Sequence, residues 1–523
     1  MSMRKHLKKS LKDERGFTMI MTTIGLSVVA MIALVAVSAV GGDINPTGRD
    51  LQRKRAYEAA KAGINDYSFH LHADNGYWAK CTKVAAPSAV NQPGSTANRR
   101  TVPGDSTASY AIELLPANGS PACDPTTIVT ATQTMLETLG STKGTFRIRS
   151  TGFAGKAQVS ITATFRPSSF LDYVYFTQLE TSDPVTYGSE AAIKGAYEQC
   201  SKTILEGRNT AKIPSTEQYC RVISFVGGDS INGPLHTNDS LVVCNKPAFG
   251  RTPSDAVEVS ASGKGWYSTS EVPHSGSSCS GTPTFVGTYL TSSPALIPPA
   301  TNAKLATIAE PGYLFKGQVH ICLSGATMQV STTSATCTGA ASVPFPANGV
   351  VYVESNLCSG AYTPFEVTYP PTSECGNVYV HGSYTGRLTI ATSNDIIIDG
   401  NTTASGEEAM LGLIANNFIR IYHPCTYSSN ANGAGSVENL SIDAALLAIN
   451  HSFIVDNYDC GGSLGTLKVH GAISQKYRGA VGTTGGTGYL KSYNYDDRLH
   501  TITPPSFLAP VQADWVIGRE TVG

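Results

Sequence analysis

The sequence predicts two kinds of structure in one chain, an α+β module at the N-terminus and a mainly β domain after it. A long apolar run over residues 17–40 predicts a helix. A hairpin pattern near residues 145–165 predicts a small antiparallel sheet beside it. Short β-branched segments then recur through the last third of the chain, as in stacked-strand domains. At 523 residues the chain is long enough for more than one folded unit.

The first helix follows a basic leader, residues 1–16, which carries six lysine and arginine residues. From Phe17 to Val40 there is no charged residue and no proline. This length suits a helix that crosses a bilayer, and it exceeds the apolar core of a cleaved signal peptide. We therefore expect residues 17–40 to form a transmembrane or fibre-core helix, with a single pass and a cytoplasmic N-terminus.

The junction Arg15-Gly16-Phe17 resembles the class III leader of type IV pilins, and the Ala-rich segment 55–63 is similar to the helix of PilX-like minor pilins. The resemblance covers about residues 10–167. It implies cleavage after Gly16 by a prepilin peptidase, N-methylation of Phe17 and packing of the helix against other pilin subunits. Pilins usually have glutamate at the fifth mature position, where this chain has Met21. This departure puts ordinary integration along a pilus shaft in doubt and leaves a tip or another position open.

The rest of the N-terminal module, residues 41–167, is expected to be an amphipathic helix with an antiparallel, pilin-like head. Gly41, Gly42 and Pro46 predict a kink or a short melted segment. Small and apolar residues then recur at helical spacing over residues 49–72, which predicts close packing on that face. Alternating residues predict a strand at 109–115 and a hairpin of 145–150 with 158–165.

Two β-rich regions follow. Residues 168–345 are rich in Gly, Ser, Thr and Pro, with short apolar runs. In residues 346–523 the segment 378–382 recurs loosely as 467–471, beside turns with Asn, His or Gly. Such units predict a solenoid, most simply a right-handed parallel β-helix with stacked interior rows, asparagine ladders and a C-terminal capping tail. The spacing is irregular, so a β-sandwich is the alternative.

The twelve cysteines all follow the apolar run, which indicates an oxidising compartment. None has the double CxxC spacing of a zinc site, so we predict no metal, and no cofactor is expected. Sequence does not fix the connectivity. Pairing of neighbours would give Cys81–Cys123, Cys200–Cys220, Cys244–Cys279, Cys322–Cys337, Cys358–Cys375 and Cys425–Cys460.

Charge and polar residues limit the possible functions. The net charge of −1 gives no electrostatic case for nucleic-acid binding. Paired carboxylates could catalyse glycan hydrolysis, but the candidates lie where turns favour Asp and Asn for backbone reasons. No catalytic residue is therefore assigned, and the chain is not expected to be an enzyme. The candidates weighed are His381, Asp395, Asp399, Asp443, Asp456 and His470.

The sequence thus predicts a minor pilin-like structural subunit of a type IV pilus or related fibre. It would reside in the inner membrane until assembly and then at the cell surface or in a pilus. Its partners would be other pilin subunits, the prepilin peptidase and a glycan or protein ligand of the β-rich head, which would serve adhesion or fibre initiation. The alternative is a signal-anchored surface protein that binds or acts on glycans through a β-helix.

Overall fold

The computed structural model divides into two compact units, residues Met1–Arg166 with Trp515–Gly523 and residues Pro167–Asp514. The second unit is thus inserted into the first, between two neighbouring strands of one sheet. The structure describes backbone and side chains in the segments given at the end of this paragraph. Over residues 15–21 and 33–47 it describes only the backbone. The described segments are residues 15–73, 76–79, 99–117, 119–120, 135–137, 144–214, 218–275, 279–332, 336–358, 374–500, 502–511 and 515–523.

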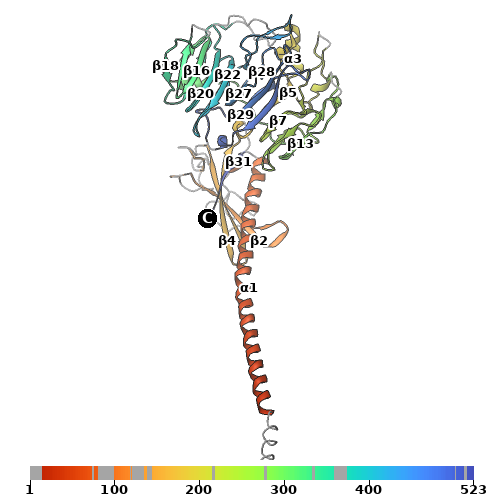
Figure 1. Cartoon of the computed structure of the whole chain (residues 1–523), viewed down its shortest axis with the longest axis vertical. Coiled ribbons are helices and arrows are strands. Elements are labelled where there is room, and N and C mark those ends of the chain that lie inside the picture. Colours follow the sequence, from red (N-terminus) through yellow and green to blue (C-terminus); the bar gives the residue numbers. More distant parts are fainter. Residues whose placement is uncertain are drawn as a thin grey trace, which may run out of the picture. The chain divides into compact units, whose positions relative to one another are not determined.

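Helix α1 of the first unit, Arg15–Ala73, is 59 residues long and continuous (Figure 1). It runs without interruption through Gly41, Gly42 and Pro46, so the predicted kink is wrong. A proline removes one helical hydrogen bond and a glycine costs about 1 kcal/mol, and these local costs do not break α1. A short 3-10 turn, η1 (Tyr77–Ala79), follows the helix.

A five-stranded sheet packs on the C-terminal half of α1, and its core joins both elements. Tyr67 of α1 lies among the aromatic rings of the sheet. Phe146 and Phe165 face each other across a strand pair with their ring centroids 5.1 Å apart. The strands, in sheet order, are β1 (Arg100–Val102), β2 (Asp105–Leu115), β3 (Phe146–Ala154), β4 (Ala157–Pro167) and β31 (Trp515–Val522).

The first four strands of this sheet pair antiparallel, and the predicted strand and hairpin are confirmed there as β2 and as β3 with β4. The fifth strand comes from the far end of the chain. The backbone N–H of Gly523, just after β31, donates a hydrogen bond of 3.0 Å to the carbonyl of Ser160 in β4. The last residues of the sequence therefore complete the sheet of the first unit.

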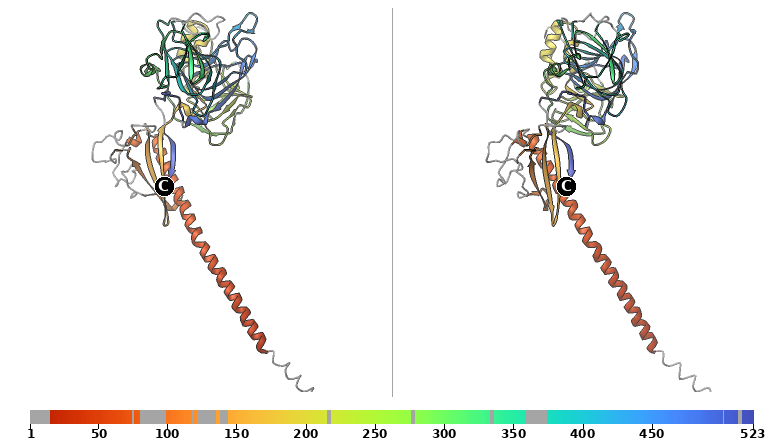
Figure 2. Two further views of the ribbon diagram at one scale, coloured as in Figure 1. Left: turned by 60° about the vertical axis from the view of Figure 1, so that its left-hand side comes forward. Right: turned by 90° about the vertical axis from the view of Figure 1, so that its left-hand side faces the viewer.

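The second unit consists mainly of strands (Figure 2). Its helical elements are η3 (Phe170–Asp172), η4 (Pro184–Tyr187), α3 (Glu190–Gln199), η5 (Arg208–Thr210), η6 (Thr269–Glu271), α4 (Lys304–Ile308) and η7 (Asp497–His500). The strands of its first half are β5 (Tyr175–Ser182), β6 (Phe225–Val226), β7 (Ser230–Asn232), β8 (Leu235–Thr237), β9 (Leu241–Cys244), β10 (Ala248–Phe249), β11 (Ala256–Val259), β12 (Trp266–Ser268), β13 (Thr284–Phe285) and β14 (Thr288–Thr291).

The second half contributes the remaining strands of this unit. They are β15 (Leu314–Lys316), β16 (Val319–Gly325), β17 (Thr327–Ser331), β18 (Ser342–Pro344), β19 (Val350–Glu354), β20 (Val378–Tyr384), β21 (Arg387–Thr392), β22 (Ile396–Ala404), β23 (Met410–Ala415), β24 (Ile419–Ile421), β25 (Cys425–Thr426), β26 (Ala431–Asn432), β27 (Ser441–Ala448), β28 (Phe453–Val455), β29 (Ser463–Arg478) and β30 (Gly488–Tyr495).

Parallel pairing stacks these strands into ladders. One ladder runs β15-β19-β21-β23-β27-β29-β5-β8-β11-β14, and every pair in it is parallel. A second ladder runs β16-β20-β22-β24-β28. Successive strands place buried side chains in a row along the stack. The clearest row is Val351, Ile390, Leu413, Leu446, Ile473, Tyr175, Leu235 and Val257.

The order of strands in the stack differs from their order in the chain. The chain enters the stack at β5, continues to one end at β14, restarts at the other end at β15 and winds back. Strand β29 then pairs with β5, so that Ile473 lies beside Tyr175. The two stretches of the second unit therefore join in the middle of the stack.

The core becomes polar at this junction. Arg478 donates to Glu180 at 2.8 Å, Lys491 donates to Asp229 at 2.8 Å, and all four side chains are buried or nearly so. The Arg478 guanidinium also lies 3.5 Å from the ring centroid of Phe225. Burial lowers the pKa of Lys491 against the opposing effect of Asp229. Buried ion pairs add little net stability, but they penalise a shifted register, because a shift would leave charges unpaired.

Asparagine side chains form the predicted ladder at one corner of the stack. Asn394 donates to Asn377 at 2.7 Å, and Asn417 donates to Asn394 at 2.6 Å. Each amide thus bonds to the same residue type on the next turn of the stack. The ladder satisfies polar groups that the turns bring together.

The fold class predicted from the sequence is wrong for the chain as a whole. Strands make up 43% of the structure and helices 17%, so the class is mainly β rather than α+β. The β-sandwich alternative fails because sandwich strands pair antiparallel, whereas these ladders are parallel. The predicted right-handed parallel β-helix is not confirmed either. Two chain segments build the stack out of sequence order, and no pairing among the described strands closes the sheet. Repeated segments in the sequence predict that the strands stack on one another, but they do not predict which strand pairs with which.

The predicted single-pass membrane location is also overturned. Among the residues that the structure describes, no helix is long and apolar enough to cross a bilayer.

Candidate functional site

The first candidate site is a stretch of α1, residues 22–32, which we call the uncovered segment. Every side chain described in it is exposed. Leu26 is 72% exposed, Val29 66% and Met31 65%. Large exposed apolar surfaces mark places where another molecule binds. A helix that is apolar on all sides is typical of one buried in a larger assembly.

Further along the same helix, small residues allow close packing on strand β3. Ala56 and Ala60 are fully buried. A Cβ added to Gly152 of β3 would lie 1.9 Å from the carbonyl oxygen of Ala56, and one added to Gly63 would lie 2.2 Å from Ser150 Oγ. Helix and strand therefore approach too closely for any larger residue at these positions. The close packing predicted from the small residues of segment 49–72 is confirmed.

The residues of the leader lie at the edge of what the structure describes. Helix α1 begins at Arg15, so the backbone of Gly16, Phe17 and Met21 is helical. Their side chains, and residues 1–14, lie outside the described part of the chain. Cleavage after Gly16 and methylation of Phe17 remain predictions.

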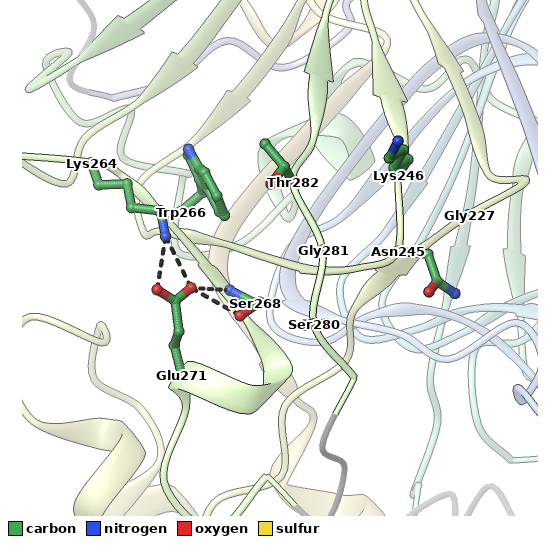
Figure 3. Close-up of a pocket in the computed structure, with 10 residues that line it drawn as sticks. All are labelled: Gly227, Asn245, Lys246, Lys264, Trp266, Ser268, Glu271, Ser280, Gly281 and Thr282. Carbon is green, nitrogen blue, oxygen red and sulfur yellow. Dashed lines mark hydrogen bonds and ion pairs between the residues drawn. The ribbon is translucent and has the colours of Figure 1, made fainter.

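The second candidate site is an open pocket of about 840 Å³ in the second unit, which we call the Trp266 pocket (Figure 3). Figure 3 shows the Trp266 indole between the side chains of Lys264 and Thr282. Asn245 and Lys246 lie on the opposite side from Glu271. The indole is half-buried, and the lysines and Glu271 are exposed. Aromatic surface and polar groups therefore meet in one hollow.

One lysine of the pocket is held in place by two contacts. Lys264 Nζ lies 3.5 Å from the indole centroid of Trp266, as in a cation–π contact, and donates to both carboxylate oxygens of Glu271 at 2.9 Å. Glu271 also accepts from the Ser268 backbone N–H at 2.7 Å. These bonds, that from Ser268 first and those from Lys264 next, lower the pKa of Glu271. The carboxylate therefore stays ionised and neutralises Lys264.

Local sequence explains why the wall with Glu271 forms. Ser268 and Glu271 make a capping box at the start of η6, which immediately follows β12. Strand β12 pairs in parallel with β9, which places Trp266 beside Leu241. Because β12, the capping box and η6 follow one another directly in the chain, the positions of Trp266 and Glu271 are fixed relative to each other.

A disulfide holds the opposite wall of the pocket. Cys244, at the end of β9, bonds to Cys279, and the Asn245 N–H donates to the carbonyl of Ser280 at 3.1 Å. Asn245 has φ of 61°, a conformation that asparagine tolerates better than most residues. A Cβ on Gly281 would lie 2.0 Å from the Asn245 carbonyl oxygen, so this close approach requires glycine.

Five disulfides are described in all, and each joins cysteines that are neighbours in the sequence. None of the described cysteines is free. The predicted pair Cys81–Cys123 lies outside the described residues. The bonds are Cys200–Cys220, Cys244–Cys279, Cys322–Cys337, Cys358–Cys375 and Cys425–Cys460.

Two of the carboxylates weighed for catalysis are buried in an ion-pair network. Arg420 donates to Asp456 through two nitrogens, at 3.0 and 3.1 Å, and to Asp395 at 3.3 Å. Burial raises the pKa of Asp395, which Arg420 opposes. Both carboxylates are at most 2% exposed, so a glycan has no access to them.

The other candidates form two separate histidine–carboxylate pairs nearer the surface. His381 Nδ1 lies 2.8 Å from Asp399 Oδ1, and His470 Nδ1 lies 3.8 Å from Asp443 Oδ1. The first pair shares a hollow of about 370 Å³ with His320. The sequence similarity of residues 378–382 and 467–471 therefore corresponds to a similar pairing at two places, not to one catalytic centre.

The described residues contain no group of three or more metal-ligating side chains close enough to hold an ion. The Trp266 pocket was missed from the sequence, because its walls come from segments joined by a disulfide and by strand pairing. The capping box Ser268–Glu271 next to Trp266 was the one local signal that could have indicated it.

Comparison with known proteins assigns no family to the chain. No protein-family model matches it. No curated protein matches it either. Among solved structures it is similar to the competence-associated pilin ComZ from Thermus thermophilus, over 90% of this chain and 97% of that chain. The sequence identity is 12% and the TM-score is 0.26, which is too low to support an argument from that protein.

Proposed function

We propose that this chain is a subunit of a pilus-type fibre, in which α1 packs against the corresponding helices of neighbouring subunits. The observation that carries the proposal is that the burial of side chains changes along one continuous helix. Residues 22–32 are exposed, uncharged and mostly apolar, whereas Ala60, Ile64 and Tyr67 are fully buried against the sheet of the same unit. One part of α1 thus belongs to the subunit, and the other part needs a partner.

The free energy available from that partner is large. Burying one large aliphatic side chain contributes about 1.5–3 kcal/mol. Several such residues in the uncovered segment would together contribute on the order of 10 kcal/mol, before the entropic cost of association. The large exposed side chains are Ile24, Leu26, Val28, Val29, Met31 and Ile32.

The leader sequence supports the same function and bears on the position in the fibre. The order Arg15-Gly16-Phe17 resembles a prepilin processing site. Met21 offers no carboxylate for the terminal amine of a neighbouring subunit, and a buried unpaired amine is costly. An end position, where the subunit starts a fibre and the inserted second unit serves adhesion, avoids that cost.

Processing of the leader tests the proposal. The full chain is produced with and without a prepilin peptidase, and the mass of its N-terminal peptide is measured. We expect a peptide that begins at Phe17 and carries one added methyl group, only when the peptidase is present. Gly16→Leu should abolish the cleavage. Gly25→Leu is the matched control, because a Cβ added at Gly25 would have no other atom within 4 Å, and it should be cleaved normally. An intact leader in both samples would contradict the proposal.

A further inference from the structure

We propose that the Trp266 pocket binds an acidic saccharide, that is, a sugar with a carboxylate such as a uronic acid. The inference does not depend on the fibre function. It rests on the residues of the pocket, on their charge balance and on the rigidity of its walls.

The mixture of surfaces in the pocket suits a sugar ring. A sugar presents C–H groups on its faces and hydroxyls around its rim. Trp266 offers apolar aromatic surface in the same pocket as the side chains of Asn245 and Thr282, which can donate and accept hydrogen bonds. A few polar groups around an apolar surface are what fixes the orientation of a small ligand.

The charge of the pocket favours an acidic sugar over a neutral one. Lys264 is neutralised by Glu271 at 2.9 Å. Lys246 is exposed, and in the described part of the chain no carboxylate contacts it. The lining therefore has one positive charge in excess. A carboxylate on the ligand would form a charge-assisted hydrogen bond with Lys246.

The pocket is also preorganised. The disulfide Cys244–Cys279 and the bond from Asn245 to Ser280 fix one wall, and the capping box fixes the other. The Lys264 side chain is already held by Glu271 and Trp266. Little conformational entropy is then lost when a ligand binds, which raises affinity for a small molecule.

A single-stranded nucleic acid fits these observations less well. Such strands bind along rows of cations with several stacking aromatic residues. This pocket has one indole and one uncompensated lysine. It matches a ligand that places one sugar ring and one carboxylate in the pocket at a time.

Binding is tested by titrating the full, unassembled chain with trigalacturonate and with the neutral sugar maltotriose. Calorimetry measures the affinity, and tryptophan fluorescence shows whether the sugar binds next to Trp266. The chain has three tryptophans, and Trp78 and Trp515 contact each other in the core of the first unit. A fluorescence change on binding therefore reports on Trp266. We expect the acidic sugar to bind about tenfold more tightly than maltotriose and to change the fluorescence.

Three variants identify the site. Lys246→Gln should weaken trigalacturonate binding about tenfold and leave maltotriose binding unchanged. Trp266→Phe should weaken both and remove the fluorescence change. Lys304→Gln, which removes another exposed lysine, is the matched control and should behave as the parent chain. Circular dichroism shows whether each variant is folded.

Three results would overturn the proposal. The first is the absence of saccharide binding by the folded parent chain. The second is binding that neither Lys246→Gln nor Trp266→Phe weakens. The third is equally tight, Lys246-dependent binding of tripolyphosphate or of a short single-stranded DNA, which would mean a general anion site. None of these results bears on leader processing, so the fibre function would be judged separately.

Discussion

At the scale of single residues, surroundings decide what a charged side chain does. Asp395 and Asp399 are close in sequence, yet Asp395 is buried beside Arg420 whereas Asp399 pairs with His381 at the surface. The sequence indicates turns at both positions, which is why neither was assigned to catalysis. This expectation is right for Asp395, which precedes strand β22, and wrong for Asp399, which lies within β22. Their partners could not be predicted, because these come from neighbouring turns of the stack.

The pair of His381 and Asp399 makes a testable prediction about pH. The hydrogen bond that His381 donates to Asp399 raises the pKa of His381 above its ordinary value, against the opposing effect of burial. The stabilisation by this pair is therefore fully present below the ordinary histidine pKa of about 6.5 and is lost as the pH rises through the raised value. Asp399→Asn should lower the pKa of His381, as measured by NMR titration of selectively labelled histidines.

A matched change at the other histidine pair provides the control. Asp443→Asn alters the partner of His470 and should leave the titration of His381 as it is in the parent chain. If Asp399→Asn does not move that titration either, the hydrogen bond does not control the histidine.

At the scale of elements, alternation and small residues were reliable local signals, whereas helix-breaking residues were not and long-range contacts could not be predicted. Alternation predicted the β3–β4 hairpin, whose strands are joined by a short turn. The small residues of segment 49–72 predicted close helix packing, because alanine and glycine leave room for a neighbouring backbone and can be read directly from the sequence. The expected kink near Pro46 failed, since local breaking tendencies did not outweigh the helix on both sides. The contact of β31 with β4 could not be predicted, because the second unit separates them in the sequence.

Two glycine substitutions, one at the contact between α1 and β3 and one in α1 away from it, are predicted to have opposite effects on stability. Gly152→Ala would push a methyl group into the backbone of α1 and should destabilise the first unit by about 1–3 kcal/mol. Gly48→Ala, in the same helix with open space around it, should stabilise the unit by about 1 kcal/mol. Calorimetric unfolding of the full chain measures both. Equal effects would mean that α1 and β3 do not approach this closely.

At the scale of the whole molecule, the chain combines one continuous helix, a sheet completed by its own last strand and an inserted stack of parallel strands. Repeated segments indicated stacking, and the rows of buried residues bear out that local inference. The order of the stack could not be predicted, because β5 and β29 are brought together only by the fold. Buried ion pairs at that junction, such as Glu180 with Arg478, favour one register of β29 against β5, because another register would leave the charges unpaired.

The proposed fibre function depends above all on the uncovered segment of α1 packing against the helices of other subunits. The most direct measurement places a photo-crosslinking amino acid at Leu26 of the full chain, in cells that assemble pilus-type fibres. Leu314, 41% exposed on β15, is the control position. We predict that the probe at Leu26 captures the apolar helix of another subunit, identified by mass spectrometry, and that the probe at Leu314 does not. No adduct at Leu26, or the same adducts from both positions, would contradict this packing.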